Sequence, residues 1–250
     1  MTCMSMKLLE GERALVTGCA GGIGRGVAKA LKAEGATVLG SDIAAPPSED
    51  GIDFLAADLA KPDGWRALLE GALERLGSIS LFVHAASPRR LESDTPLTVS
   101  EDTWDAMTGI NLRSGFFLAR EIGRHMRDGK IKGRILLITS QHRETPRNLP
   151  HYSAAKAGMT MAMKELARVL APDGIRVNAI APGAIPGGGF VAGNLGELVA
   201  QIPLGRAGTP DDVAQVAVAI LSERFGRYVV GTTVEVDGGL GLISWIPAHA

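Results

Sequence analysis

The sequence predicts an α/β fold, with a doubly wound, mostly parallel β-sheet that carries helices on both faces. Short apolar runs alternate with longer stretches of helical periodicity along the whole chain, which is typical of repeated strand–helix–strand units. The composition agrees, because 46% hydrophobic and 21% charged residues provide an ordinary globular core. The 250 residues contain no composition break, linker or internal repeat. We therefore expect residues 1–250 to form a single domain.

The expected strands are short apolar runs. In chain order they are Ala14–Val16, Thr37–Ser41, a short strand that contains Leu55 and ends near Asp58, Ile79–Ala85, Arg134–Ser140, Arg176–Ala181 and Thr232–Val236. The expected helices carry apolar residues at helical spacing. They are Gly24–Glu34, Pro62–Leu76, Ser100–Arg127 with Ser100 as its N-cap, His151–Leu170 and Pro210–Ser222.

Two segments depart from this alternation. Pro46 and Pro47 oppose a helix between the second and third strands, so we expect the crossover helix there to be shortened to a turn or missing. The segment Gly183–Ile202 is rich in glycine and lacks strong periodicity. We expect it to cover a site as a mobile loop or a short helix, as a substrate loop would.

Charge and composition exclude several classes of protein. The formal net charge is −1, so no basic excess points to nucleic acid. We expect no secretory signal in the N-terminal residues, and no run of about 18 apolar residues predicts a membrane span. Cys3 and Cys19 lack metal-type spacing. We expect a cytoplasmic protein without a membrane span, a nucleic-acid partner or a metal site.

A glycine-rich turn follows the first strand, with the sequence Thr17-Gly18-Cys19-Ala20-Gly21-Gly22-Ile23-Gly24, and a helix follows the turn. Glycine permits both positive φ angles and a close approach of phosphate oxygens to the backbone. The N-terminus of the helix then presents free N–H groups and a partial positive charge to a pyrophosphate. Although a glycine-rich surface turn is the plain alternative, the strand–turn–helix context predicts a Rossmann-type dinucleotide site.

Asp42 ends the second strand about 20 residues after the turn. A carboxylate there can accept hydrogen bonds from the adenosine ribose hydroxyls and repels a 2′-phosphate. The sequence therefore predicts NAD in preference to NADP. Arg25, directly after Gly24, could still reach a phosphate and weaken this preference.

Three polar residues are expected at the carboxyl edge of the sheet: Ser140 at the end of a strand, and Tyr152 and Lys156 one helical turn apart. Oxidation of an alcohol requires removal of the hydroxyl proton as hydride leaves the same carbon. A free tyrosine, with a pKa of about 10, is a poor base, but a neighbouring lysine cation favours its phenolate form. These residues predict general acid–base catalysis.

The TGxxxGIG turn, the YxxxK pair and the upstream serine together resemble the single-domain branch of the short-chain dehydrogenase/reductase family. The resemblance implies that Tyr152 is the acid/base, that Lys156 tunes it and holds the nicotinamide ribose, and that Ser140 binds the substrate oxygen. It also implies that Asn111 holds a water of the proton relay, although a purely structural asparagine is the alternative. Implied cofactor contacts are Gly18, Gly22, Ile23, Gly24, Asp42, Asp58 at the adenine amino group, Leu59, Ala85, Ala86, Tyr152, Lys156, Pro182 and Gly183 at the carboxamide, and Ile185.

The sequence also departs from the family pattern. His84-Ala85-Ala86-Ser87 stands where the family often has Asn-Asn-Ala-Gly, so we interpret His84 as a polar core group, with a catalytic role as the alternative. Ser140 and Tyr152 are twelve positions apart, one fewer than the family spacing. The threonine usual after Pro-Gly is missing. We expect a reshaped substrate pocket.

The substrate is poorly determined by the sequence. Arg143 and Arg147 could pair with a carboxylate or phosphate, and Arg89 and Arg90 could line the rim, but solvated loop charges are an equal alternative. We expect a small polar secondary alcohol, such as a sugar, polyol or hydroxy acid. Reduction of a 3-oxoacyl thioester and a non-catalytic nucleotide sensor are the alternatives. The resemblance implies a homo-oligomer, a tetramer or dimer, and the apolar tail 241–247 could bury against a neighbouring subunit, the active site or its own domain.

Overall fold

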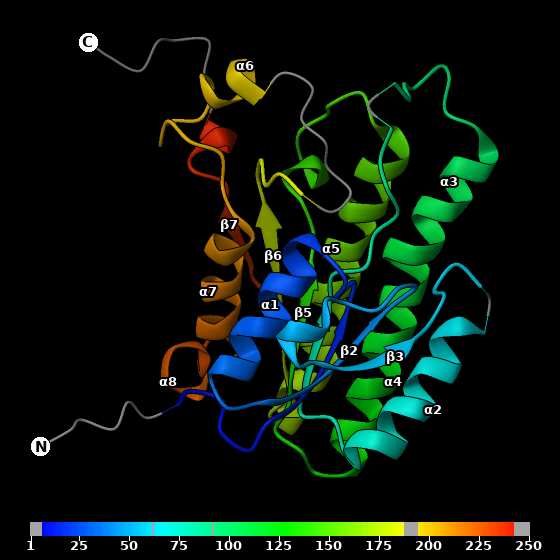
Figure 1. The fold of residues 1–250 in the computed structure, drawn as a ribbon. Coiled ribbons are helices and arrows are strands. Elements are labelled where there is room, and N and C mark those ends of the chain that lie inside the picture. The colour runs from blue at the N-terminus through cyan, green and yellow to red at the C-terminus, as the bar shows by residue number, and fades with distance from the viewer. Residues whose placement is uncertain (1–6, 62, 92, 188–194, 243–250) are drawn as a thin grey trace, which may run out of the picture.

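The computed structural model describes residues 7–61, 63–91, 93–187 and 195–242. Its centre is a sheet of seven parallel strands in the order β3-β2-β1-β4-β5-β6-β7 (Figure 1). The strands are β1 Arg13–Thr17, β2 Thr37–Asp42, β3 Asp53–Ala56, β4 Leu81–His84, β5 Arg134–Ile138, β6 Arg176–Pro182 and β7 Thr233–Val236. The predicted doubly wound parallel sheet is confirmed, and every expected strand is present.

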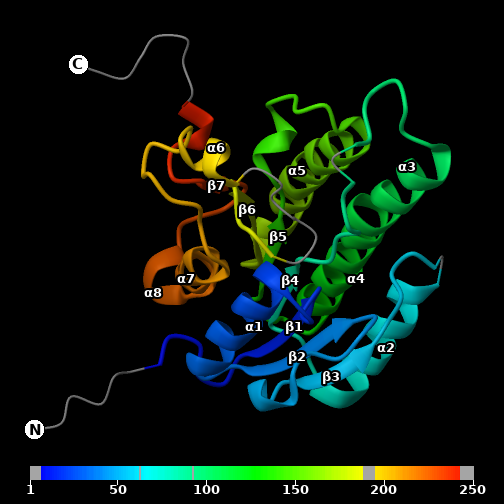
Figure 2. The ribbon, with the colours of Figure 1, turned by 45° about the horizontal axis from the view of Figure 1, so that its top comes forward.

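Helices cover both faces of the sheet. They are α1 Gly22–Ala33, α2 Gly64–Leu76, α3 Glu101–Thr108, α4 Gly115–Asp128, α5 Pro150–Leu170, α6 Leu195–Val199, α7 Pro210–Leu221 and α8 Glu223–Gly226. Figures 1 and 2 show α1 and α7 on one face and α2, α4 and α5 on the other. This sandwich follows from the strands themselves, since every residue of β4, β5 and β6 is buried and both faces of the sheet need a cover.

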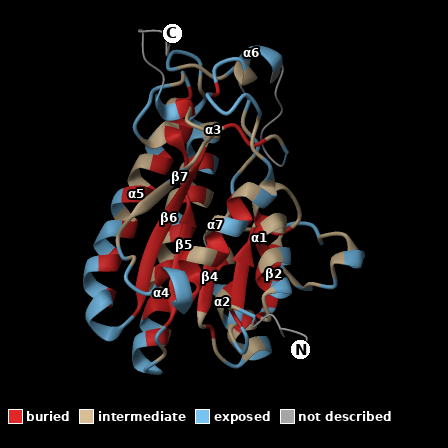
Figure 3. Ribbon diagram, turned by 90° about the vertical axis from the view of Figure 1, so that its left-hand side faces the viewer, coloured by how far each residue is buried: buried red, intermediate tan, exposed pale blue. Residues whose placement is uncertain are grey.

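The two layers form two apolar clusters, visible as the buried centre of Figure 3. Val27, Leu31 and Val213 pack between the sheet and the α1–α7 layer, while Leu118 and Met163 pack on the opposite face. Among the described residues, no helix has the length and apolar character to cross a membrane. Nor does this part of the chain contain a group of His, Cys, Asp or Glu side chains suited to a metal ion.

The expected long helix 100–127 is present but not regular. Ser100 caps α3 as predicted, accepting a hydrogen bond from the Thr103 N–H at 3.2 Å. A π-helical stretch, η2 Gly109–Ser114, then separates α3 from α4. Such π turns often occur at functional sites. The sequence pattern did not predict this one, which contains Asn111.

The two irregular segments are as expected in outline. The crossover between β2 and β3 is reduced to one 3₁₀ turn, Ser48–Asp50. The substrate loop contains the short helix α6, while its residues 188–194 lie outside the described residues, as do Cys3 and the tail 243–247. Several boundaries differ by two residues: β4 begins at Leu81, β5 ends at Ile138 and α1 begins at Gly22. β3 ends at Ala56 rather than near Asp58, because the Asp58 carboxylate starts a turn by accepting the Ala60 N–H at 3.0 Å.

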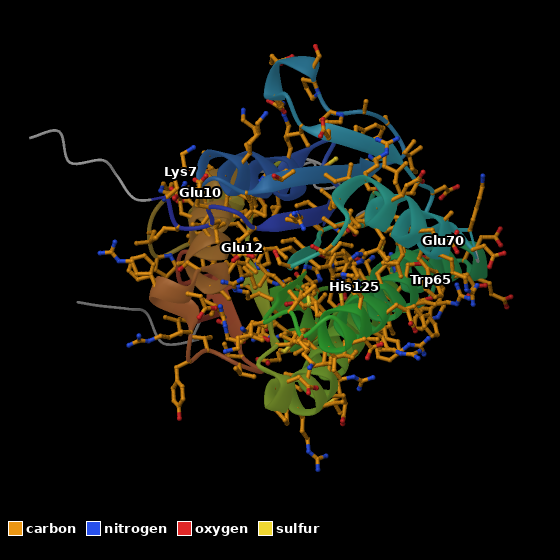
Figure 4. All side chains as sticks on the ribbon, turned by 90° about the horizontal axis from the view of Figure 1, so that it is seen from below. Lys7, Glu10, Glu12, Trp65, Glu70 and His125 are labelled. Atoms are coloured by element: carbon orange, nitrogen blue, oxygen red, sulfur yellow. The ribbon has the colours of Figure 1, made fainter. Side chains whose placement is uncertain are left out.

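The strand order gives the two edges of the sheet different roles. After β3 the chain crosses to β4 on the far side of β1, so the connections that leave the carboxyl ends of β1 and β4 run to opposite sides and open a crevice. The amino edge is closed by polar contacts instead. There Glu12 accepts hydrogen bonds from Arg134 at 2.7 Å and from Ser80 at 2.6 Å, and His125 accepts the Ile79 N–H (Figure 4).

Candidate active site

A cavity of about 650 Å³ lies at the carboxyl edge of the sheet. It runs from the glycine turn between β1 and α1 to the first turns of α5. Its lining includes every predicted cofactor and catalytic residue except Asp58 and Asn111. The structure therefore brings the two halves of the sequence motif together in one space.

Local sterics explain the glycines of the turn. Gly18 has a φ of +73°, and a Cβ there would lie 2.7 Å from the Ala85 carbonyl carbon. A Cβ at Gly24 would lie 2.0 Å from the Gly18 carbonyl oxygen. These positions allow α1 to begin directly against the turn, so that its free N–H groups point toward the cavity.

The carboxylate of Asp42 marks the nucleotide end of the cavity. It accepts hydrogen bonds from the Ala20 N–H at 3.0 Å and the Ile43 N–H at 2.7 Å, which fix it beside the glycine turn. Arg25 does not neutralise it. The Arg25 guanidinium instead binds Asp50, with 2.5 Å between Nε and Oδ2.

Asp58 lies beside the cavity rather than in its lining, which includes its neighbours Ala57 and Leu59. Its carboxylate caps the turn at Ala60 and lies 3.9 Å from Lys61. Asp58 therefore has a structural role in this turn. A contact with an adenine amino group stays a prediction.

Tyr152 and Lys156 project from the same side of α5, as their spacing predicts. The Lys156 ammonium donates a hydrogen bond to the Ile138 carbonyl at 2.8 Å and lies 5.5 Å from the centre of the Tyr152 ring. Burial, together with the charge of Arg90, lowers the pKa of Lys156 to about 7. Ser140, two residues after the end of β5, lines the same end of the cavity, and its Oγ accepts the His142 N–H at 3.2 Å.

Asn111 is buried in the π-helical stretch. Its amide nitrogen donates to the Met107 carbonyl at 3.0 Å, while its side-chain oxygen is buried and has no hydrogen-bond partner in the described part of the chain. A buried amide oxygen of this kind normally has a partner, often an ordered water. The geometry thus meets the requirement of the predicted water-holding role without testing it.

His84 occupies a structural position between the turn and η2. Its Nε2 lies 3.2 Å from the Ile110 carbonyl and its Nδ1 lies 2.9 Å from the Thr17 hydroxyl. Because a carbonyl only accepts, Nε2 carries the proton and Nδ1 accepts from Thr17. Burial lowers the pKa of His84 to about 3, so the ring is neutral. This geometry agrees with the interpretation of His84 as a polar core group.

The sequence did not predict how the loops surround Tyr152. The Arg90 guanidinium lies 4.7 Å from the centre of the Tyr152 ring, and the His142 ring meets it edge to face at 5.1 Å. Arg89, Arg90 and Arg147 line the cavity. Arg143 instead binds Glu235 at 2.7 Å and Glu144 at 3.1 Å. The arginines were visible in the sequence, but no periodic signal showed which of them face inward.

Comparison with known proteins decides the family. A family model described as enoyl-(acyl carrier protein) reductase matches residues 18–241. The chain belongs to the short-chain dehydrogenase/reductase family. It is therefore an oxidoreductase that acts on CH–OH groups with a nicotinamide cofactor.

Two relatives and one solved structure extend the match to almost the whole chain. Glucose 1-dehydrogenase 2 of Bacillus subtilis is 33% identical over 252 residues, covering 94% of this chain and 97% of that protein. The 2-dehydro-3-deoxy-D-gluconate 5-dehydrogenase of Escherichia coli is 34% identical, covering 92% and 96%. A structure described as a putative short-chain alcohol dehydrogenase from Sinorhizobium meliloti is 30% identical, with a TM-score of 0.84 over 94% of this chain and 98% of that one.

The residues present fit a nicotinamide dinucleotide. The cradle at Gly18 and Gly24 is one that a Cβ would fill, and it lies at the N-terminus of α1. The small side chains of Ala85 and Ala86 line the cavity, as do Pro182 at the end of β6 and Gly183 and Ile185 after it. Backbone and small side chains thus form a continuous groove from Asp42 to Tyr152.

Proposed function

We propose that the protein is an NAD-preferring dehydrogenase that interconverts a small polar secondary alcohol, such as a sugar, polyol or hydroxy acid, and the corresponding ketone. One observation carries this proposal. Ser140, Tyr152 and Lys156 line one end of a cavity whose other end carries the glycine cradle and Asp42.

In this proposal each residue acts on one part of the alcohol. The Ser140 hydroxyl binds the substrate oxygen, and the Tyr152 oxygen takes the hydroxyl proton during oxidation or returns it during reduction. Lys156 stabilises the phenolate through its positive charge. The orphaned side-chain oxygen of Asn111 holds a water through which the proton leaves. The groove from Asp42 to Tyr152 would hold the nicotinamide cofactor, which would supply hydride transfer to or from the reacting carbon.

The preference for NAD rests on Asp42 and Arg25. The Asp42 carboxylate accepts from ribose hydroxyls and repels a 2′-phosphate, and the nearest arginine of the turn, Arg25, is already bound to Asp50. Replacing Asp42 by Ser together with Ile43→Arg should shift the ratio of kcat/KM for NAD over NADP at least tenfold toward NADP. An unchanged ratio would contradict the assignment of Asp42.

The main test follows NADH formation by absorbance over a panel of sugars, polyols, hydroxy acids and simple secondary alcohols, with NADP in parallel. Turnover is expected with NAD. Tyr152→Phe should lower kcat by roughly 10²–10⁴ while NADH binding stays within twofold of wild type. Unchanged turnover in Tyr152→Phe would overturn the catalytic assignment.

Two other functions give different results in the same experiments. A 3-oxoacyl reductase would reduce an acetoacetyl thioester, and comparing NADH with NADPH would reveal its cofactor. A nucleotide sensor would bind NADH but turn over nothing. The retained Tyr152 and Lys156 favour the enzyme.

We also propose a homo-oligomer, a tetramer or a dimer. Met161 and Val169 on α5 and Trp104 on α3 are apolar yet 58%, 61% and 39% exposed, which favours burial of this surface against another copy. Sedimentation velocity should give a mass of two or four chains. A single-chain mass at micromolar concentration would contradict it.

A further inference from the structure

The end of the cavity around Tyr152 is surrounded by positive charge. Arg89, Arg90, Arg147 and Lys156 line it, whereas Asp42, at the opposite end, is the one carboxylate among the described lining residues. The pKa of His142 is lowered to about 3, first by burial and then by the positive charges of Arg90 and Arg147. Both guanidinium groups therefore lie close enough to His142 to influence its protonation. His142 is therefore neutral and adds no charge of its own.

Arg147 differs from its neighbour in the same loop. Arg143 is bound to Glu235 and Glu144. Within the part of the chain that the structure describes, Arg147 has no ion-pair partner, and its buried Nε has no hydrogen-bond acceptor. The Arg143 Nε also lacks a hydrogen bond, but Glu144 lies 3.1 Å from it, so the missing carboxylate is what distinguishes Arg147. A partly buried guanidinium without an acceptor is costly unless a ligand supplies one. The planar fork of arginine is suited to two oxygens of a carboxylate or phosphate.

The positions of Arg90 and His142 indicate where an acceptor for Arg147 would lie. The Arg90 guanidinium lies over the Tyr152 ring, 4.7 Å from its centre, and the His142 ring lies against the same tyrosine. A negatively charged group bound here would sit a short carbon chain away from the hydroxyl that Tyr152 deprotonates. It would supply the counter-charge that Arg147 lacks among the described residues.

We propose that the substrate carries a small oxyanion, a carboxylate or a phosphate, close to its reacting alcohol, and that Arg147 and Arg90 bind it. This inference rests on the proposed dehydrogenase function and narrows its substrate class from neutral sugars and polyols to their acids or phosphate esters. Arg147 is a specificity-determining residue in this assignment.

A binding experiment tests the oxyanion site without turnover. Malonate and its neutral diamide are titrated into the protein–NADH complex at constant ionic strength and followed by calorimetry, with inorganic phosphate in parallel. Malonate or phosphate should bind at least tenfold more tightly than malonamide. Tighter binding of malonate would indicate a carboxylate on the substrate, and tighter binding of phosphate would indicate a phosphate. Arg147→Gln should reduce the preference to within about twofold, whereas Arg127→Gln, on the last turn of α4, should leave it unchanged. Equal affinity for malonate, phosphate and malonamide would overturn the proposal.

A turnover experiment then separates this inference from the proposed function. Each hydroxy acid or sugar acid of the panel is compared with its primary amide, using kcat/KM. The acid should be favoured, and Arg147→Gln should lower its kcat/KM about 10- to 100-fold while that of the amide changes less than twofold. Equal losses for acid and amide would indicate a structural role and overturn the proposal. Anion binding without turnover of any alcohol would support the oxyanion site and contradict the dehydrogenase.

Discussion

Both edges of the sheet hold buried or partly buried arginines, but these arginines differ in whether the chain supplies a counter-charge. At the amino edge, Arg134 lies 2.7 Å from Glu12 and 3.1 Å from Glu223, and Arg176 lies 3.3 Å from Glu223. At the carboxyl edge, Arg147 faces the cavity without an ion-pair partner among the described residues. A structural arginine therefore pairs with a carboxylate of its own chain, whereas a ligand-binding arginine has no such partner until the ligand binds.

The largest expected effect contrasts these edges directly. Glu12→Gln removes one partner of the buried Arg134 and should lower the free energy of unfolding by about 2–3 kcal/mol, somewhat less than for a fully buried pair. Arg147→Gln should change it by less than about 0.5 kcal/mol, since no protein partner is lost. Urea denaturation measures both. Equal losses would show that Arg147 is structural.

At the carboxyl edge, His84 has a hydrogen-bond partner at each ring nitrogen, and Gly115 makes room for the ring. A Cβ at Gly115 would lie 2.7 Å from the His84 Cδ2 atom. Gly115→Ala should therefore destabilise the wild type by about 1–3 kcal/mol through overpacking. In a His84→Ala background it should be neutral or stabilising, because the clash is gone and alanine favours the helix. A double-mutant cycle should give about 2 kcal/mol of coupling, and additive effects would contradict this packing.

The same contrast explains what could be predicted from sequence. The glycine turn, Asp42 and the Tyr152–Lys156 pair depend on local sterics and on helix or strand periodicity, so their positions followed from the sequence. The stacking of Arg90 on Tyr152 joins residues of two separate loops, and no local pattern encodes it. The π-helical stretch at Asn111 was missed for a similar reason. It lies inside an otherwise regular helical pattern, and its contacts are with α5 and, through the Ile110 carbonyl, with the His84 ring, both distant in sequence.

Lowering the pH should reduce the free energy of unfolding, because the His84 and His142 imidazoles are neutral in the folded protein. Burial lowers the pKa of both His84 and His142 to about 3, against about 6.5 in the unfolded chain. Between these values the unfolded state binds a proton that the folded state does not, so stability falls as the pH falls. Each histidine contributes at most about 1.4 kcal/mol per pH unit.

Urea denaturation of wild type at pH 7, 6 and 5 should show this decrease. His84→Asn and His142→Asn should each make the dependence on pH shallower, the first more strongly because His84 is completely buried. A slope that His84→Asn leaves unchanged would mean that the ring is protonated in the folded protein.

The smallest expected effect concerns the ion pair that joins the loop between β5 and α5 to β7. Arg143 is the arginine of this loop that binds the protein itself, through Glu235 at the carboxyl end of β7. Glu235 is 44% exposed, so solvent screens the pair. A double-mutant cycle with Arg143→Gln and Glu235→Gln should give about 0.5–1 kcal/mol of coupling in unfolding free energy.

This pair is also the control for the contrast between bound and open arginines. Because Arg143 already has its carboxylates, Arg143→Gln should leave the preference for malonate over malonamide unchanged, even if it loosens the loop and weakens both ligands together. A selective loss of malonate affinity would place Arg143 at the oxyanion instead. Arg143 would then bind substrate although it is paired with a protein carboxylate. The distinction between structural and ligand-binding arginines would fail within this loop.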